Sequence, residues 1–311
     1  MVGIKEYLKN KIPDKIIREV KRSFEIIGDI AIVEISKEVR KYEKEIGNAI
    51  LKINSSIKTV LKKEGIRQGE FRTQKLKRIA GENKKETIYR ENGIILKLDV
   101  EKIYFSAKLG TERKELCSNI KENSNVLVMF SGCGPYTFNI LKYQPNLSLI
   151  DSVEINSIGH KYALENLDLN KNLLKKSKKF NNLIIKLKEE KKYINEKEII
   201  KKLNSEKIHF YCGDVRKIVE KEIKDMRYDE IFMPLPKDAE HFLDCAFKVV
   251  NKNCIVHMYD FVHENDFPHK TEDSVKSAAK KHNRKIKILQ TRKVGQYSPR
   301  KYRVCCDFIV R

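Results

Sequence analysis

The sequence has seven cysteines but no Cys-x-x-Cys pair, no apolar run long enough to span a bilayer and no signal-peptide core at its N-terminus. The missing pairs exclude a cysteine metal site and a disulfide framework, so the cysteines are expected to be small buried side chains in a reducing compartment. The missing apolar runs exclude a membrane protein. We therefore expect a cytoplasmic protein without a metal, acting as a monomer.

Acidic residues are in the minority. The chain has 43 Asp and Glu against 65 Lys and Arg, a formal charge of +22. No structural role requires such an excess, and its field attracts polyanions, so nucleic acid is the leading partner. A general lysine bias of the source proteome is the alternative. The uneven clustering of the basic residues favours the functional interpretation.

The chain is long enough to form two domains. Residues 1–112 mix short elements and predict a small α+β domain. Apolar spacing predicts a helix over 43–53, and the strand patterns fall at 29–35 and 94–100.

From 113 to 311, strand and helix patterns alternate, which predicts a parallel, doubly wound sheet. The fold class is therefore α/β, a Rossmann-like sheet preceded by a smaller α+β domain. The last two strands lie close together around a loop at 295–299 and could pair antiparallel. Residues 171–207 are rich in Lys, Asn and Glu and predict an inserted helical excursion with a basic solvent face. The strand candidates are 126–130, 149–154, 208–212, 230–233, 254–259, 285–291 and 302–310.

A β-branched apolar run stops at a Gly-x-Gly turn, Gly132-Cys133-Gly134, and a helical pattern follows. The next apolar run ends in an acid, Glu154, which can accept both hydrogens of a ribose diol. The turn lacks the third glycine that accommodates a pyrophosphate, so a nucleoside without phosphates, such as S-adenosylmethionine, fits better than a dinucleotide. The predicted cofactor-binding residues are Phe130, Gly132, Gly134, Pro135, Glu154, Ile155, Asp214 and Val215.

Five sequence blocks carry a family resemblance that begins near residue 25 and reaches the C-terminus. With them, the chain resembles the archaeal and eukaryotic tRNA methyltransferases that modify N1 of the guanosine 3′ of the anticodon. The blocks are Gly69-Glu70-Phe71-Arg72-Thr73, Glu91-Asn92-Gly93, the stretch Tyr104–Arg113, the glycine turn with Glu154-Ile155-Asn156 and Asn166–Asn170, and Tyr297-Ser298-Pro299-Arg300.

The resemblance implies S-adenosylmethionine as cofactor, tRNA as partner and a first domain that grips tRNA. It also implies roles for single residues. Glu112 resembles the general base, Arg72 the arginine that contacts O6 of the target guanine, and Tyr104 a tyrosine of the substrate pocket. Pro234 and Pro236 correspond to the turn after the fourth strand and complete the expected catalytic set.

The implied roles agree with the chemistry. Guanine N1 carries a proton at neutral pH, and a carboxylate can take it as the methyl group arrives. Negative charge then spreads toward O6, where a guanidinium stabilises it. Without the resemblance, Glu112 would be interpreted as an ordinary acid in the first turn of a helix.

The chain departs from the family pattern at several points. Val128 replaces an Asp near the end of the first strand, Pro234 replaces an Asn, and Lys108 replaces an Arg. The extra N-terminal domain of some relatives is expected to be absent or reduced to the first helix. The Pro-Leu-Pro turn and short N-terminus resemble an archaeal branch that also methylates carbon 7 of the wyosine precursor imidazoguanosine.

Two alternatives stay open. The first is the paralogous transfer of an aminocarboxypropyl group in wyosine synthesis. The segment Phe105-Ser106-Ala107-Lys108-Leu109 lacks the Gly-Asn pair of that family and favours methyl transfer. The second is a non-catalytic RNA-binding protein on a methyltransferase fold. His257 is interpreted as a hydrogen-bonded sheet histidine and not as a catalyst.

Overall fold

The computed structural model describes residues 3–190, 193–234 and 239–311, which divide into two compact units. The N-terminal unit comprises the residues up to Glu91 together with Ile95–Ala107. The C-terminal unit comprises Asn92–Ile94 and Lys108–Arg311, and it contains Glu112. Among the described residues, no helix combines the length and apolar character that crossing a membrane requires.

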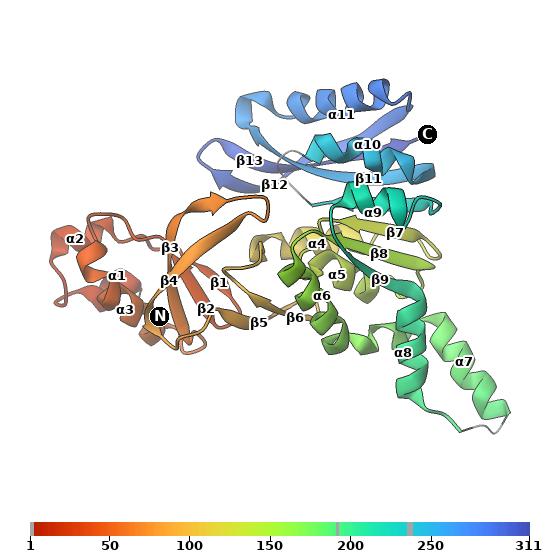
Figure 1. The fold of residues 1–311 in the computed structure, drawn as a ribbon. Coiled ribbons are helices and arrows are strands. Elements are labelled where there is room, and N and C mark those ends of the chain that lie inside the picture. Colours follow the sequence, from red (N-terminus) through yellow and green to blue (C-terminus); the bar gives the residue numbers. More distant parts are fainter. Residues whose placement is uncertain (1–2, 191–192, 235–238) are drawn as a thin grey trace. The chain divides into compact units, whose positions relative to one another are not determined.

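The N-terminal unit packs short helices on one small sheet (Figure 1). Its strands follow the order β1-β2-β3-β4, in which β2 and β3 are parallel and the other pairs antiparallel. A separate two-stranded sheet, β5 and β6, follows. The helices are α1 (Ile4–Leu8), α2 (Asp14–Glu19), η1 (Arg40–Tyr42) and α3 (Glu43–Ile53). The strands are β1 (Glu25–Ile27), β2 (Ile30–Val33), β3 (Thr59–Gln68), β4 (Thr73–Gly81), β5 (Glu86–Glu91) and β6 (Ile94–Asp99).

Helix α3 shows why this unit folds as the sequence predicts. Its apolar residues recur at helical spacing and bury one face, including Ile46 and Ile50. Gly47 lies on the same face, where a Cβ atom would come within 2.7 Å of the Cβ of Ala80 on β4. A glycine at this position therefore permits the close approach of helix and sheet.

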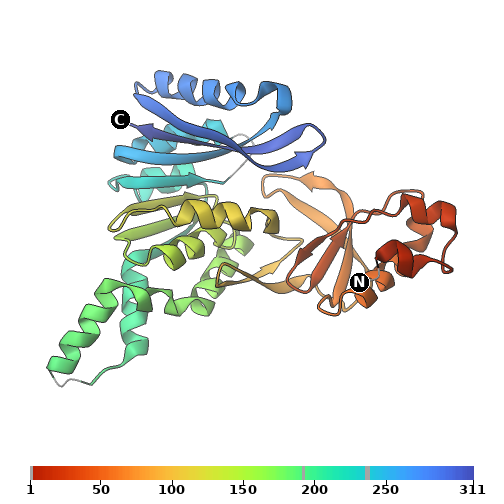
Figure 2. The same cartoon turned by 180° about the vertical axis from the view of Figure 1, so that it is seen from behind.

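The C-terminal unit is built on a seven-stranded sheet of order β12-β13-β11-β10-β7-β8-β9 (Figures 1 and 2). The five strands from β11 to β9 are parallel, and β13 runs antiparallel to both β11 and β12. The predicted fold class is thereby confirmed, including the antiparallel pairing of the last two strands. The strands are β7 (Asn125–Met129), β8 (Leu149–Glu154), β9 (Ile208–Cys212), β10 (Tyr228–Met233), β11 (Val250–His263), β12 (Ile286–Ser298) and β13 (Lys301–Val310).

Helices cover both faces of this sheet. On one face α9, α10 and α11 bury a core that contains Leu127, Ile231 and Val256. On the other, α5 places Thr137 against Ser152 of β8, with their hydroxyl oxygens 2.8 Å apart. The helices are η2 (Ala107–Leu109), α4 (Gly110–Cys117), α5 (Pro135–Tyr143), α6 (Ser157–Leu169), η3 (Lys171–Lys176), α7 (Lys178–Glu189), α8 (Glu196–Lys207), α9 (Val215–Lys221), η4 (Ala239–Phe242), α10 (Leu243–Lys248), η5 (Glu264–Asp266) and α11 (His269–Lys281).

Two segments are notable. Helices α7 and α8 lie within 171–207 and project away from the sheet (Figure 1). The loop predicted at 295–299 is wrong, because β12 continues to Ser298 and the hairpin turns at Pro299 and Arg300. Shifts in the β12–β13 register let the strand absorb the Gly-containing segment as bulges and not as a loop.

Candidate active site

The predicted glycine turn follows β7 at its carboxyl end. Three residues of the turn, Phe130, Gly132 and Gly134, have positive φ angles of 58°, 57° and 89°. Gly134 is the N-cap of α5, and Pro135 occupies the first turn, where its missing N–H leaves no bond unmade. A Cβ on Gly134 would lie 2.5 Å from the ring of Phe138, so only glycine fits this position. Phe130 adopts the left-handed region without being glycine, a strain that concentrates at functional sites.

Glu154 ends β8, and its carboxylate ties this strand to the glycine turn. Oε2 accepts a hydrogen bond from the backbone N–H of Gly132 at 2.6 Å, and Oε1 accepts one from Asn156 N–H at 2.7 Å. Burial raises the pKa of Glu154, against the opposing effect of these backbone bonds. Each oxygen has two lone pairs, so the carboxylate can still accept further donors.

Asp214 follows β9 and begins α9 as its N-cap, accepting the N–H of Arg216 at 2.9 Å. The guanidinium of Arg216 also donates to both carboxylate oxygens, at 3.1 and 2.8 Å, and lowers the pKa of Asp214. Val215 beside it is buried. Since β7, β8 and β9 are adjacent and parallel, Asp214, Glu154 and the glycine turn lie along one edge of the sheet. Open α/β sheets bind ligands at this edge.

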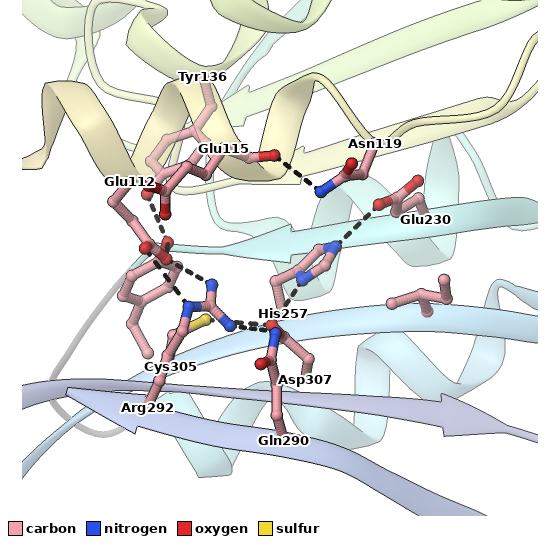
Figure 3. Close-up of polar contacts among 12 residues, drawn as sticks. Glu112, Glu115, Asn119, Tyr136, Glu230, His257, Gln290, Arg292, Cys305 and Asp307 are labelled. Atoms are coloured by element: carbon pink, nitrogen blue, oxygen red, sulfur yellow. Dashed lines mark hydrogen bonds and ion pairs between the residues drawn. The ribbon is translucent and has the colours of Figure 1, made fainter. Parts of the chain in front are cut away.

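Glu112 lies buried in the first turn of α4, within a chain of polar contacts (Figure 3). Its Oε1 accepts hydrogen bonds from the Tyr259 hydroxyl at 2.9 Å and from Arg292 Nη2 at 2.6 Å. Among the described residues, a single hydrogen bond reaches Oε2, from Arg292 Nε at 3.4 Å. The Tyr259 hydroxyl in turn accepts the hydrogen bond of the Tyr136 hydroxyl at 2.7 Å.

Arg292 also connects Glu112 to further charged side chains in the sheet. Its Nη1 pairs with Asp307, whose other oxygen lies 2.7 Å from Nδ1 of His257. Nε2 of His257 lies 2.8 Å from Glu230. Burial alone would lower the pKa of His257, but the two carboxylates outweigh it and raise the pKa to about 9. His257 is therefore an imidazolium between two carboxylates, hydrogen-bonded within the sheet as the sequence suggested.

Arg72 and Tyr104 meet within the N-terminal unit. Arg72 lies in the turn between β3 and β4, at a positive φ of 50°, and its N–H donates to the carbonyl of Gly69 at 3.2 Å. Its guanidinium lies over the ring of Tyr104, 5.1 Å from the centroid, a cation–π contact. The structure thus brings these two predicted residues together.

Three further positions from the sequence analysis are Pro234, Pro236 and Val128. Pro234 directly follows β10 and is half-buried, at the same sheet edge as the glycine turn. Pro236 lies outside the described residues. Val128, one of the departures from the family pattern, is fully buried within β7 and contributes to the core.

Sequence reasoning missed Arg292, Tyr259 and Asp307. Asp307 carried one signal, because it is the single acid within the apolar run of β13, and a buried carboxylate requires a partner. The cation that pairs with Asp307 is determined by the strand register, and the register cannot be deduced from the sequence. Among the described residues, no group of three His, Cys, Asp or Glu side chains could hold a metal ion.

Two family models match successive parts of this chain. The family model described as the TYW2 N-terminal domain matches residues 4–84, and that of the TRM5/TYW2 methyltransferase domain matches 87–177 and 184–289. The tRNA (guanine(37)-N(1))-methyltransferase Trm5b of Pyrococcus abyssi is 36% identical over 299 residues, covering 96% of this chain and 78% of the relative.

Two further relatives are informative. A tRNA (guanine(37)-N(1))/4-demethylwyosine(37)-methyltransferase, Taw22 of Nanoarchaeum equitans, is 35% identical over 306 residues, covering 91% of this chain and 97% of the relative. The solved complex of aTrm5 with tRNALeu superposes with a TM-score of 0.76 at 28% identity, covering 99% of this chain and 78% of that one.

Proposed function

The chain belongs to the TRM5/TYW2 methyltransferase family, and on this basis we propose that it transfers a methyl group from S-adenosylmethionine to N1 of guanosine 37 in tRNA. The observation that carries the proposal is the similarity to Trm5b along 96% of the chain, at 36% identity. The protein is accordingly a tRNA (guanine-N1)-methyltransferase with tRNA as its macromolecular partner. We further propose that it acts as a monomer in the cytoplasm, where its tRNA substrate is found.

The residues at the carboxyl edge of the sheet fit this cofactor. Gly132 and Gly134 carry no side chain that would keep a ligand from the backbone, and Glu154 keeps lone pairs for the two hydroxyls of a ribose. Phe130, Pro135 and Ile155 border these groups in the sequence, and Asp214 with Val215 would lie near the adenine. When bound, the sulfonium of S-adenosylmethionine supplies an already activated methyl group.

The protein's own residues then manage the proton and the charge of the base. We assign Glu112 to accept the N1 proton and Arg72 to stabilise the negative charge that develops on O6. Tyr104, which stacks with Arg72, is assigned to the substrate pocket. Pro234 and Pro236 would form a rigid turn beside the base. The formal charge of +22 supports tRNA phosphates as the main source of affinity.

One observation favours a second product. Pro234 stands where the family carries an amide that could hold the base edge, and Taw22, 35% identical, is named for both guanosine 37 and 4-demethylwyosine. We propose that methylation at carbon 7 of the tricyclic wyosine precursor is a further activity of the same site.

The test uses tRNA transcripts that differ only at position 37 and S-adenosylmethionine labelled in its methyl group. Label should enter the transcript with guanosine 37 and not the one with adenosine 37, and S-adenosylhomocysteine should accumulate. Methylthioadenosine as by-product would establish aminocarboxypropyl transfer instead. No binding of the cofactor in isothermal titration would support the non-catalytic RNA-binding alternative.

A further inference from the structure

The two carboxylate oxygens of Glu112 are not equivalent. Oε1 accepts two short hydrogen bonds, from Tyr259 at 2.9 Å and Arg292 at 2.6 Å. Within the part of the chain that the structure describes, Oε2 has only the 3.4 Å contact with Arg292 Nε. A carboxylate oxygen has two lone pairs, so Oε1 is saturated. Oε2 is the oxygen with capacity for an additional proton.

Arg292 is also held by a second carboxylate, that of Asp307. It is shared between Glu112 and Asp307, and Asp307 also accepts Gln290 Nε2 at 2.9 Å and contacts His257 at 2.7 Å (Figure 3). The planar guanidinium can bridge two carboxylates because its donors point in fixed directions. Its orientation is therefore set by the sheet and not by Glu112 alone.

The charges along this chain alternate in sign. Glu112, Asp307 and Glu230 are acids, and they are separated by Arg292 and by His257, whose pKa is raised to about 9. Five ionisable groups from α4, β10, β11, β12 and β13 thus form one connected cluster. Breaking one buried pair would leave an uncompensated charge, which is costly, so the cluster is rigid.

We propose that Tyr259 and Arg292 are positioning residues for the proton transfer in this reaction: they saturate Oε1 of Glu112 and so fix Oε2 as the atom that accepts the guanine N1 proton. The proposal rests on the proposed function. In this step the N1–H bond breaks and an O–H bond forms at Oε2. The electron pair left on N1 forms the bond to the methyl carbon, and the pair of the broken carbon–sulfur bond stays on sulfur.

The ionisable groups around Glu112 determine which charges reach its carboxylate. Among the described residues, Tyr136 on α5 and Cys305 on β13 also interact electrostatically with Glu112. Burial raises the pKa of Tyr136, Tyr259 and Cys305 far above neutrality, so these groups stay neutral in the working range. Arg292 is therefore the cation in direct contact with the Glu112 carboxylate.

The experiment is single-turnover methylation of transcript with guanosine 37 at saturating cofactor, with Tyr259→Phe, Arg292→Lys and Arg292→Gln made in the wild-type and Glu112→Gln backgrounds. Tyr228→Phe is the matched control, because it also removes a buried tyrosine–carboxylate bond in the same sheet, to Asp151. In the wild-type background we expect Tyr259→Phe to slow the reaction by about tenfold to a hundredfold, since a misplaced group costs up to about a hundredfold.

Further results are expected for the other variants. In the Glu112→Gln background, Tyr259→Phe and Arg292→Lys should cause no additional loss, because they act through Glu112. Arg292→Gln, which removes the cation beside Glu112, should slow the reaction only in the wild-type background. In the wild-type background Arg292→Lys should slow it as well, because lysine lacks the planar fork that bridges Glu112 and Asp307. The Tyr228→Phe enzyme should react at the wild-type rate.

Equal slowing in both backgrounds, or a wild-type rate in Tyr259→Phe, would overturn the positioning role while leaving the proposed function intact. A wild-type rate for Glu112→Gln itself would remove Glu112 from the mechanism and the positioning role with it. The Arg292 variants are used only if they fold, as judged by cofactor binding in titration calorimetry. If they do not fold, the comparison of Tyr259→Phe in the two backgrounds decides whether the positioning role holds, because this substitution does not change the charge.

Discussion

Three buried ionisable side chains in the C-terminal unit are each held by specific partners. Glu154 binds backbone N–H groups of the glycine turn, Glu112 binds Arg292, and His257 binds two carboxylates. An unpaired buried charge costs several kcal/mol, so such side chains persist only where partners are fixed. The polar groups proposed to act on substrate are therefore held in place before a ligand arrives.

Glu112→Gln should slow methylation by on the order of a hundredfold or more, because glutamine keeps the shape of the side chain but cannot accept the N1 proton. Cofactor affinity should survive, since the glycine turn and Glu154 lie on other elements. Single-turnover rates across pH and calorimetric titration with S-adenosylmethionine measure the two quantities. A near wild-type rate at neutral pH would show that solvent or a backbone group takes the proton.

Cofactor affinity should depend on pH through Glu154. Burial raises the pKa of this carboxyl, so its protonated form appears at higher pH than for an ordinary glutamate. The protonated carboxyl is a poorer acceptor for a ribose diol, so affinity should fall as the pH drops into the mildly acidic range. Glu154→Gln should bind more weakly and lose most of this dependence. Titration calorimetry that gave parallel pH curves for both proteins would contradict the ribose assignment.

Local sequence was sufficient to predict the cofactor edge but not the partners of Glu112. The strand, the glycine turn and the strand ending in Glu154 are contiguous patterns whose geometry follows from backbone sterics. Arg292 is separated from Glu112 by 180 positions and reaches it only through the β12–β13–β11 register. No short pattern encodes such a pairing, so the cluster became visible only in the fold.

Secondary-structure elements followed the sequence closely where apolar periodicity was strong. The helix predicted over 43–53 is found as Glu43–Ile53, and the strand predicted at 149–154 is found as Leu149–Glu154. The prediction is wrong at the last hairpin, where glycine, serine and proline at 295–299 suggest a loop. There β12 tolerates Gly295 at a bulge, because the long antiparallel pairing with β13 outweighs the local preference.

The contact of β10, β11 and β13 through His257 should make stability depend on pH. Because the folded-state pKa of about 9 exceeds the ordinary value of 6.5, protonation of His257 favours the folded state. This contribution is complete below pH 6.5 and is lost as pH rises through about 9. The free energy of unfolding of the wild-type protein should therefore decline over that window in denaturant titrations.

His257→Gln provides the control for this prediction. The variant should be less stable at neutral pH and should show a flatter decline between pH 6.5 and 9, because glutamine carries no titrating proton. If both proteins lost stability in parallel across the window, the charged state assigned to His257 would be wrong.

The protein as a whole carries a large positive charge, which should dominate its affinity for tRNA. With a formal charge of +22, binding should weaken steeply with salt, and the logarithm of the affinity should fall linearly with the logarithm of the salt concentration. Filter binding between low and moderate salt measures the slope. An affinity that stayed flat over this range would contradict phosphate contact as the main source of affinity.

Variants in the helices at 171–207 test whether this segment contributes to the salt dependence of tRNA binding. Lys186 and Lys188 are exposed on α7, and replacing both with Gln should reduce the salt slope by about one to two if each contacts a phosphate. Lys248 and Lys252, near the amino end of β11 and so opposite the cofactor edge, provide the matched control pair. Equal effects of the two pairs would mean that total charge, and not this insertion, sets the affinity.

The most direct measurement is the identity of the modified nucleoside. Purified protein is incubated with methyl-labelled S-adenosylmethionine and an unmodified tRNA transcript carrying guanosine 37, and the product is digested and separated by liquid chromatography with mass detection. We predict 1-methylguanosine as the labelled nucleoside, derived from position 37 and formed together with S-adenosylhomocysteine. Label in another nucleoside or at another position, or an unlabelled transcript with a protein that binds the cofactor, would contradict the proposed activity.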